Sequence, residues 1–282
     1  MDKNDDKKFL TAAGAKILVV DDNDMNLKVI SGLLKRNKIF PDLVDSGQEG
    51  IEIAKKNFYH IIFLDNMMPG LNGIETLKRM QQEKILSDKT KVIMLTASAI
   101  AGMREIYLRE GFDDYLTKPI DVSELESILA RHLPKELVTF EEEEKKIIIE
   151  EEEKVGEDEF SRRDKKKFCE TCPDINLEVA LKYCMDSKSF LTQMLMTFSN
   201  GGKKADKIAE KFASQDWKNY QILVHALKST SLSIGAEKLS ESAKKLEMAA
   251  KNGQIEEILA NHESLIAEYK KVREEIDIWL KS

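Results

Sequence analysis

The sequence is poor in cysteine, with only three among its 282 residues. So few thiols predict a reducing compartment rather than a disulfide framework. Cys169 and Cys172 are spaced like half of a zinc site or a redox pair, but no second pair follows them and only Cys184 is left over. We assign these cysteines no function.

Long hydrophobic runs and an excess of basic charge are also missing. No apolar stretch approaches the roughly 20 residues of a membrane-spanning helix, and the start MDKNDDKKFL lacks the apolar centre of a signal peptide. The 51 acidic residues outnumber the 44 basic ones, which argues against a concentrated basic face or a DNA-recognition helix. We therefore expect a cytoplasmic chain that binds no nucleic acid directly and has no membrane segment, although a longer parent protein could be membrane-anchored.

A regular alternation of strand-like and helix-like segments extends from Lys16 to about Leu133. Five β-rich runs each precede a segment of helical period: KILVV, PDLV, HIIFLD, KVIMLT and DDYLTKP. Strands that alternate with helices in this way form a parallel sheet covered on both faces, and right-handed crossovers favour a doubly wound closure. The sequence therefore predicts an α/β doubly wound five-stranded parallel sheet over residues 16–133.

The remainder of the chain has a different character. Residues 1–15 read as an N-terminal tail, and residues 134–173 are so rich in charge that they predict a solvated linker, helical only in part. Residues 174–282 have helical periodicity throughout, with short loops such as SNGG, IGAE and KNGQ between segments. This pattern predicts an all-α helical bundle as a second domain.

Polar residues stand where the predicted strands end. Asp21 and Asp22 follow the first strand, Asp65 ends the third, Thr96 the fourth and Lys118 the fifth. Because such folds place their sites at the carboxyl ends of parallel strands, we expect these groups to converge. Three carboxylates repel one another unless a hard cation neutralises them, and Mg²⁺ prefers oxygen ligands. An acid, Mg²⁺, an ammonium and a hydroxyl around one point suit phosphoryl transfer.

The motifs ILVVDDN, LDNMMPG, LTASA and YLTKP, in this order, resemble those of a response-regulator receiver domain, which has a flavodoxin-like fold. The resemblance covers residues 16–133. It implies that Asp65 is the phosphoacceptor, and that Asp21, Asp22 and Asp65 hold Mg²⁺ together with the backbone carbonyl of Met67.

The same resemblance assigns roles to three further residues. It implies that Lys118 pairs with the phosphoryl group and that the peptide bond between Lys118 and Pro119 is cis. It also implies that Thr96 and Tyr115 form the pair that registers phosphorylation. No chemical residue of the receiver pattern is replaced in this chain.

One of only four histidines, His225, lies within a long predicted helix of the second domain. At about 100° per residue, one arc of that helix predicts its buried face: Leu223, Ala226, Leu227, Thr230 and Ile234. His225 lies opposite that arc, so we expect a solvent-exposed imidazole with Lys228 one turn further on. No His, Cys, Asp or Glu stands three or four residues from His225, which argues against a metal site.

The motif HALKSTSLSIGA resembles that of a histidine phosphotransfer (HPt) domain, and the match covers about residues 174–282. The resemblance implies that His225 carries a phosphoryl group, that Lys228 holds a phosphoryl oxygen, and that a downstream receiver domain docks at His225. A neutral imidazole is a good nucleophile near pH 7 and attacks through its own lone pair. The family favours glycine after the lysine, where this chain has Ser229.

A receiver followed by an HPt domain resembles the C-terminal part of hybrid sensor histidine kinases. This order implies two-component phosphorelay signalling, from an upstream histidine kinase domain to Asp65, then to His225 and a downstream receiver. The sequence has no glycine-rich nucleotide-binding boxes and no dimerisation-histidine segment before the receiver. We therefore expect a phosphotransfer module, either a piece of a hybrid kinase or a stand-alone relay protein, rather than a complete kinase.

A phosphohydrolase of another class is the alternative. Mg²⁺-dependent enzymes with an aspartate nucleophile have a DxD motif on their first strand, whereas here an amide, Asn23, stands two residues after Asp21. Turnover separates the two functions, because a relay protein takes about one phosphoryl group per site while a hydrolase releases phosphate continuously.

Overall fold

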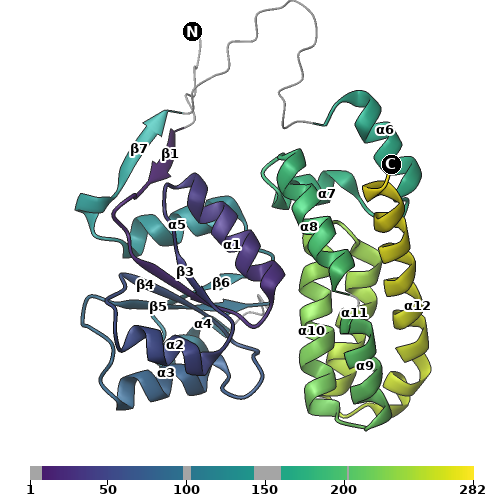
Figure 1. The fold of residues 1–282 in the computed structure, drawn as a ribbon. Helices are drawn as coiled ribbons and strands as arrows, with labels where there is room; N and C mark the ends of the chain where they lie inside the picture. The colour runs from purple at the N-terminus through teal and green to yellow at the C-terminus, as the bar shows by residue number, and fades with distance from the viewer. Residues whose placement is uncertain (1–7, 98–102, 143–159, 202) are drawn as a thin grey trace, which may run out of the picture. The chain divides into compact units, whose positions relative to one another are not determined.

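The computed structural model describes residues 8–97, 103–142, 160–201 and 203–282 (Figure 1). The chain divides into two compact units, Met1–Lys154 and Val155–Ser282, and each is described by itself. None of the helices in the described ranges is both long enough and apolar enough to span a membrane.

The first unit contains a five-stranded parallel sheet in the order β3-β2-β4-β5-β6. The strands are β2 (Ile17–Val20), β3 (Asp42–Val44), β4 (Ile61–Asp65), β5 (Lys91–Thr96) and β6 (Asp114–Thr117). The helices are α1 (Asp24–Arg36), α2 (Gly47–Ala54), α3 (Gly73–Gln82), α4 (Met103–Arg109) and α5 (Val122–His132). The predicted α/β doubly wound sheet is confirmed.

Helices cover both faces of this sheet, with α1 and α5 on one side and α2 and α3 on the other (Figure 1). Every residue of β2 and β4 is buried, as expected for strands covered on both faces. One apolar core lies between the sheet and the second group of helices, and it includes Leu64, Leu77, Met94 and Tyr107. This packing makes the strand ends a rigid base for the side chains that follow them.

Side-chain caps begin the helices that follow the strands. The Asn23 side chain accepts from the backbone N–H of Met25 at the start of α1. Asn72 and Glu75 form a reciprocal capping box at the start of α3. A Cβ on Gly73 would lie 2.4 Å from the backbone oxygen of Asp65, so only glycine lets α3 begin this close to the end of β4.

A two-stranded antiparallel sheet forms where we expected only tail and linker. It pairs β1 (Lys8–Thr11) with β7 (Thr139–Glu142), which follows the 3₁₀ turn η1 (Lys135–Leu137). The Thr11 and Thr139 hydroxyls lie 2.7 Å apart, and Lys38 donates to both oxygens of Glu141 at 2.6 and 2.7 Å. The partners lie 128 residues apart, so local composition gave no signal. The rest of the expected tail and linker, residues 1–7 and 143–159, lies outside the described residues.

The described part of the second unit is helical, as predicted (Figure 1). Its helices are α6 (Arg162–Thr171), α7 (Leu177–Tyr183), α8 (Lys188–Asn200), α9 (Lys203–Ala213), α10 (Trp217–Ser233), α11 (Glu237–Lys251) and α12 (Ile255–Leu280). Gly235, with φ of +78°, makes the turn between α10 and α11. A Cβ there would lie 2.2 Å from the backbone oxygen of Asn176, so the turn requires glycine.

The end of the expected linker is instead part of this bundle. Phe168 of α6 is fully buried, and its ring centre lies 5.2 Å from that of Trp279 on α12. Phe160 stacks on the same indole at 6.2 Å. Cys172 donates to the backbone oxygen of Glu275 at 3.5 Å, and burial raises its pKa to about 12. These aromatic contacts are tertiary, which explains why the highly charged sequence around them suggested a linker.

Candidate functional site

The predicted acidic pocket is assembled at the carboxyl ends of the strands. Lys118 Nζ lies 2.5 Å from Asp21 Oδ2 and 2.6 Å from Asp65 Oδ1. Asp21, Asp22 and Asp65 each offer an oxygen, and these atoms all lie within 4.8 Å of one another. The register of the sheet produces this convergence, because Val20 pairs with Leu64 and Asp65 pairs with Leu95.

Burial and the ammonium of Lys118 act in opposite directions on the pKa of Asp65. The residue is 2 % exposed, and burial, assisted by the negative charges of Asp21 and Asp22, raises its pKa to about 7 against the opposing effect of Lys118. Burial opposes the charged form of Lys118, but the two carboxylates outweigh it and raise the ammonium's pKa. One ammonium cannot neutralise three carboxylates, and a purely oxygen donor set with excess negative charge fits a hard divalent cation.

The hydroxyl of Thr96 is bonded to a tyrosine that the sequence analysis did not consider. Thr96 Oγ1 lies 3.0 Å from the phenolic oxygen of Tyr107 on α4. Tyr115, the residue implied by the resemblance, is half-buried, and its ring centre lies 6.3 Å from that of Tyr107. The peptide bond between Lys118 and Pro119 is cis, as expected.

The expectation of a solvent-exposed His225 was wrong. His225 is only 7 % exposed, and its Nδ1 lies 2.7 Å from Oε1 of Glu247 on α11. Lys228 donates to the other oxygen of the same carboxylate at 2.6 Å. From the predicted buried arc, Leu227, Thr230 and Ile234 are buried, while Leu223 and Ala226 are half-buried. A single-face pattern failed because α10 packs against α7, α9 and α11.

Ser229, the residue after Lys228, also lies inside the bundle. It is 4 % exposed, and its hydroxyl is 3.4 Å from the backbone oxygen of His225. Ser233 donates to the backbone oxygen of Ser229 at 3.0 Å, and Ser240 of α11 donates to that of Lys228 at 2.9 Å. Small residues here allow α10 and α11 to approach closely, so a large residue at Ser229 would disturb the packing.

Glu247 is the partner of His225 and Lys228 that the sequence did not reveal. Burial opposes its ionised form, but hydrogen bonds and charge from His225 and Lys228 outweigh burial and lower its pKa to about 2. An ionised carboxylate only accepts hydrogen bonds, so the proton of the bond between the two residues lies on His225 Nδ1. The helical period of α11 contains no signal for this contact, because the partners lie on different helices.

Glu247→Ala is expected to lower the free energy of unfolding by about 1–3 kcal/mol, because it leaves His225 and Lys228 without their buried partner. Glu247→Gln should lower the free energy of unfolding by less, since its amide oxygen still accepts a hydrogen bond from His225. The depressed pKa means that the wild-type stabilisation is complete above about pH 4.5 and is lost as the pH falls toward about 2. Denaturant unfolding at several pH values measures both effects, with the exposed Glu241→Ala as control. Equal stability of Glu247→Ala and Glu241→Ala would contradict this account.

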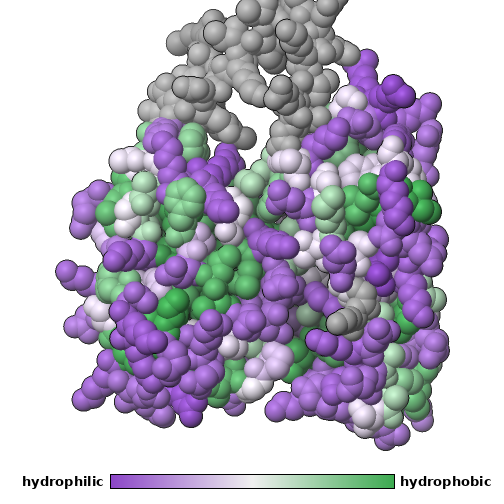
Figure 2. Space-filling model, in the orientation of Figure 1, coloured by the Kyte–Doolittle hydropathy of each residue, from purple (hydrophilic) through white to green (hydrophobic). Residues whose placement is uncertain are grey.

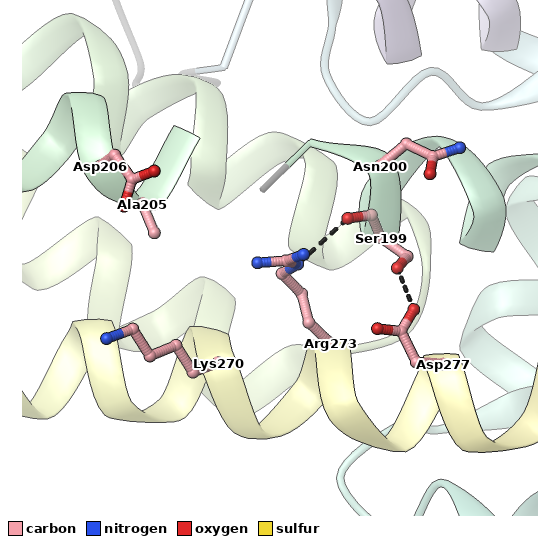
Figure 3. Close-up of a pocket in the computed structure, with 7 residues that line it drawn as sticks. All are labelled: Ser199, Asn200, Ala205, Asp206, Lys270, Arg273 and Asp277. Atoms are coloured by element: carbon pink, nitrogen blue, oxygen red, sulfur yellow. Dashed lines mark hydrogen bonds between the residues drawn. The ribbon is translucent and has the colours of Figure 1, made fainter. Parts of the chain in front are cut away.

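An open pocket of about 560 Å³ lies elsewhere in the second unit, between α8, α9 and α12 (Figure 3). Its lining residues are Ser199, Asn200, Ala205, Asp206, Lys270, Arg273 and Asp277. Arg273 Nε donates to the backbone oxygen of Ser199 at 3.1 Å, and the Ser199 hydroxyl bonds to the Asp277 carboxylate. The charges of the two basic and two acidic side chains that line this pocket cancel. The pocket shares no residue with the His225 site.

Two family models match the chain, one in each unit. The family model described as a response regulator receiver domain matches residues 17–130, and the model described as an Hpt domain matches residues 193–275. The chain therefore carries a receiver domain followed by an Hpt domain. This combination assigns it to two-component phosphorelay signalling, and neither match favours a phosphohydrolase.

Relatives of the chain include hybrid kinases. It is 38% identical over 118 residues to the signal transduction histidine-protein kinase BarA of Escherichia coli K12, covering 42% of this chain and 13% of that protein. It is 33% identical over 131 residues to hybrid signal transduction histidine kinase G of Dictyostelium discoideum, covering 46% of this chain and 4% of that protein. The chain thus spans only a small part of these relatives.

A solved structure is also similar to part of the chain. It is the complex of the Saccharomyces cerevisiae histidine phosphotransfer signaling protein Ypd1 with the receiver domain of its downstream response regulator Ssk1. The aligned chain is 29% identical, with a TM-score of 0.40, and the alignment covers 46% of this chain and 97% of that one.

Proposed function

We propose that Asp65 is the phosphoacceptor of the receiver domain and that His225 is the phosphoacceptor of the Hpt domain, with the phosphoryl group moving from Asp65 to His225. The observation that carries this proposal is the ion pair between Asp65 and Lys118 at 2.6 Å among converging carboxylates. A buried nucleophile held by a fixed positive charge is suited to phosphoryl transfer, where catalysis is mostly positioning and charge neutralisation.

In the first step, a carboxylate oxygen of Asp65 attacks the phosphorus of the donor. The new P–O bond forms as the bond to the donor's leaving group breaks, and the leaving group takes the electron pair. Lys118 stabilises the negative charge on the phosphoryl oxygens, and the Thr96 hydroxyl donates a hydrogen bond to one of them. Mg²⁺, which Asp21, Asp22, Asp65 and the Met67 carbonyl would hold, supplies further charge neutralisation when bound.

In the second step, Nε2 of His225 attacks the phosphorus of an aspartyl phosphate. A P–N bond forms as the P–O bond breaks, and the carboxylate of the donor departs with the electron pair. Glu247 accepts from Nδ1–H and stabilises the positive charge that the ring gains. We propose that Lys228, whose ammonium lies at the same carboxylate, binds a phosphoryl oxygen.

The partners follow from these steps. An upstream histidine kinase domain would phosphorylate Asp65, and a downstream receiver domain would dock at His225 and accept the group. In a piece of a hybrid kinase and in a stand-alone relay protein alike, Asp65 and His225 would be the two acceptor sites.

Incubation with Mg²⁺ and labelled acetyl phosphate tests this function. Bound phosphate should reach a plateau of no more than one group at Asp65 and one at His225, because each acceptor is consumed as it reacts. EDTA should slow uptake at least about a hundredfold, since unneutralised carboxylates repel the donor. Continuous release of inorganic phosphate far beyond this stoichiometry would support a phosphohydrolase instead, and uptake that EDTA leaves unchanged would contradict the Mg²⁺ site.

A further inference from the structure

A second hydroxyl is buried behind Thr96 at the edge of the acidic pocket. Tyr107 is 2 % exposed, and its phenolic oxygen lies 3.0 Å from Thr96 Oγ1. Thr96 directly follows Leu95, the residue of β5 that pairs with Asp65 in the sheet. Burial raises the pKa of Tyr107, and the negative charge of Asp65 adds to that rise while the bond to Thr96 opposes it. Tyr107, Thr96 and the phosphoacceptor are therefore linked by both geometry and charge.

The direction of the bond follows from the surrounding charge. The Thr96 hydroxyl has one proton and can also accept. Asp65 pairs with Leu95, the residue before Thr96, and its negative charge acts on the phenol that Thr96 bonds, so the favourable orientation directs the Thr96 proton toward that charge. Its lone pair then accepts the proton of Tyr107. The β-branched side chain of Thr96 also has few χ1 rotamers, and the bond to Tyr107 favours the one observed.

We propose that Tyr107 is a positioning residue for phosphorylation: by donating to Thr96, it holds the threonine hydroxyl with its proton facing the phosphoryl group on Asp65. This inference rests on the proposed function of Asp65. It also makes α4 part of the site, because the same hydrogen bond joins that helix to the end of β5.

The surroundings of Tyr107 support such a role. Its ring packs edge-on against Phe112, with ring centres 6.3 Å apart, and at a tilt against Tyr115 at the same distance. The ring is also part of the core that lies against the sheet, together with Met94. A phenol held by packing loses little conformational freedom when it forms its hydrogen bond, so it can order a neighbouring hydroxyl effectively.

A double-mutant cycle tests the proposal in the full chain carrying His225→Gln, which keeps the label on Asp65. The measurement is the rate of phosphate uptake from acetyl phosphate with Mg²⁺. Tyr107→Phe should slow uptake about threefold to tenfold, the usual net value of one hydrogen bond. Thr96→Val should slow it at least as much, and adding Tyr107→Phe to Thr96→Val should have no further effect.

Tyr59→Phe is the matched control, because Tyr59 is equally buried in the same core but bonds Asp42 at 2.6 Å, away from the pocket. It should keep the wild-type rate. Thr96→Ser provides a second background for the same comparison. Serine has more accessible χ1 rotamers than threonine, so its hydroxyl depends more on the bond to Tyr107 for its orientation. Tyr107→Phe should therefore slow uptake by a larger factor in Thr96→Ser than in the parent chain. A merely structural defect would slow every background equally.

The outcomes separate the two claims. If the parent chain takes up no phosphate, the proposed function of Asp65 fails, and the role of Tyr107 fails with it. If the parent chain is phosphorylated normally but Tyr107→Phe keeps its rate, or slows Thr96→Val by the same factor as the parent, only the role of Tyr107 is overturned.

Discussion

Asp65→Asn is expected to reduce phosphate uptake from acetyl phosphate by at least about a thousandfold, because an amide lacks the nucleophilic carboxylate oxygen. The fold should survive, since Lys118 keeps Asp21 as a partner at 2.5 Å. Burial raises the pKa of Asp65 to about 7, so its ionisation costs stability as the pH rises from about 4 to about 7. Asparagine removes that cost, and at neutral pH the variant should melt no lower than the wild type.

Intact-mass measurement after exposure to acetyl phosphate and Mg²⁺ checks the uptake, and thermal melting checks the fold. Asp88→Asn, which changes an exposed aspartate, is the matched control and should label as the wild type does. Labelling of Asp65→Asn at the wild-type rate would place the phosphoacceptor elsewhere. A large loss of melting temperature would show that the Asp65 charge is needed for folding.

His225→Gln is expected to remove all phosphate that is acid-labile and base-stable, the signature of a phosphorylated imidazole, because an amide nitrogen has no comparable lone pair. Labelling at Asp65 should remain. Glu247→Gln should still form the histidine phosphate, but more slowly, since its neutral amide stabilises the charged ring less well than a carboxylate does.

Chemical-stability assays on labelled full-length chains, followed by mapping of the labelled peptide, measure this effect. His60→Gln, which changes a half-buried histidine of the other unit, should leave the histidine phosphate intact. Acid-labile, base-stable label that persists in His225→Gln would show that another residue carries the phosphoryl group.

The acidic pocket was predictable because parallel topology converts sequence order into spatial convergence. Asp21, Asp65, Thr96 and Lys118 each stand at a strand end, and strands of one parallel sheet end at the same edge. A strand pattern thus locates residues that are far apart along the chain. The fold class of both units was predictable from local periodicity, because the spacing of apolar residues distinguishes strands from helices.

Features that depend on contact between different elements were not predictable in this way. The period of α10 distinguishes one face from another, but it contains no information about how many neighbours cover the helix, so His225 was expected in solvent. Glu247 and Tyr107 reach their partners across helix and sheet boundaries. The pairing of β1 with β7 joins the two ends of the first unit and has no local signature.

Phosphoryl transfer between two variant chains tests the central claim most directly. His225→Gln, labelled at Asp65 with radioactive phosphate and freed of donor, is mixed with unlabelled Asp65→Asn, so that only one chain can give and only the other can receive. We predict that acid-labile, base-stable label appears on His225 of the Asp65→Asn chain as it leaves the first. Loss of the label solely as inorganic phosphate, at the rate seen without the second chain, would contradict a relay from Asp65 to His225.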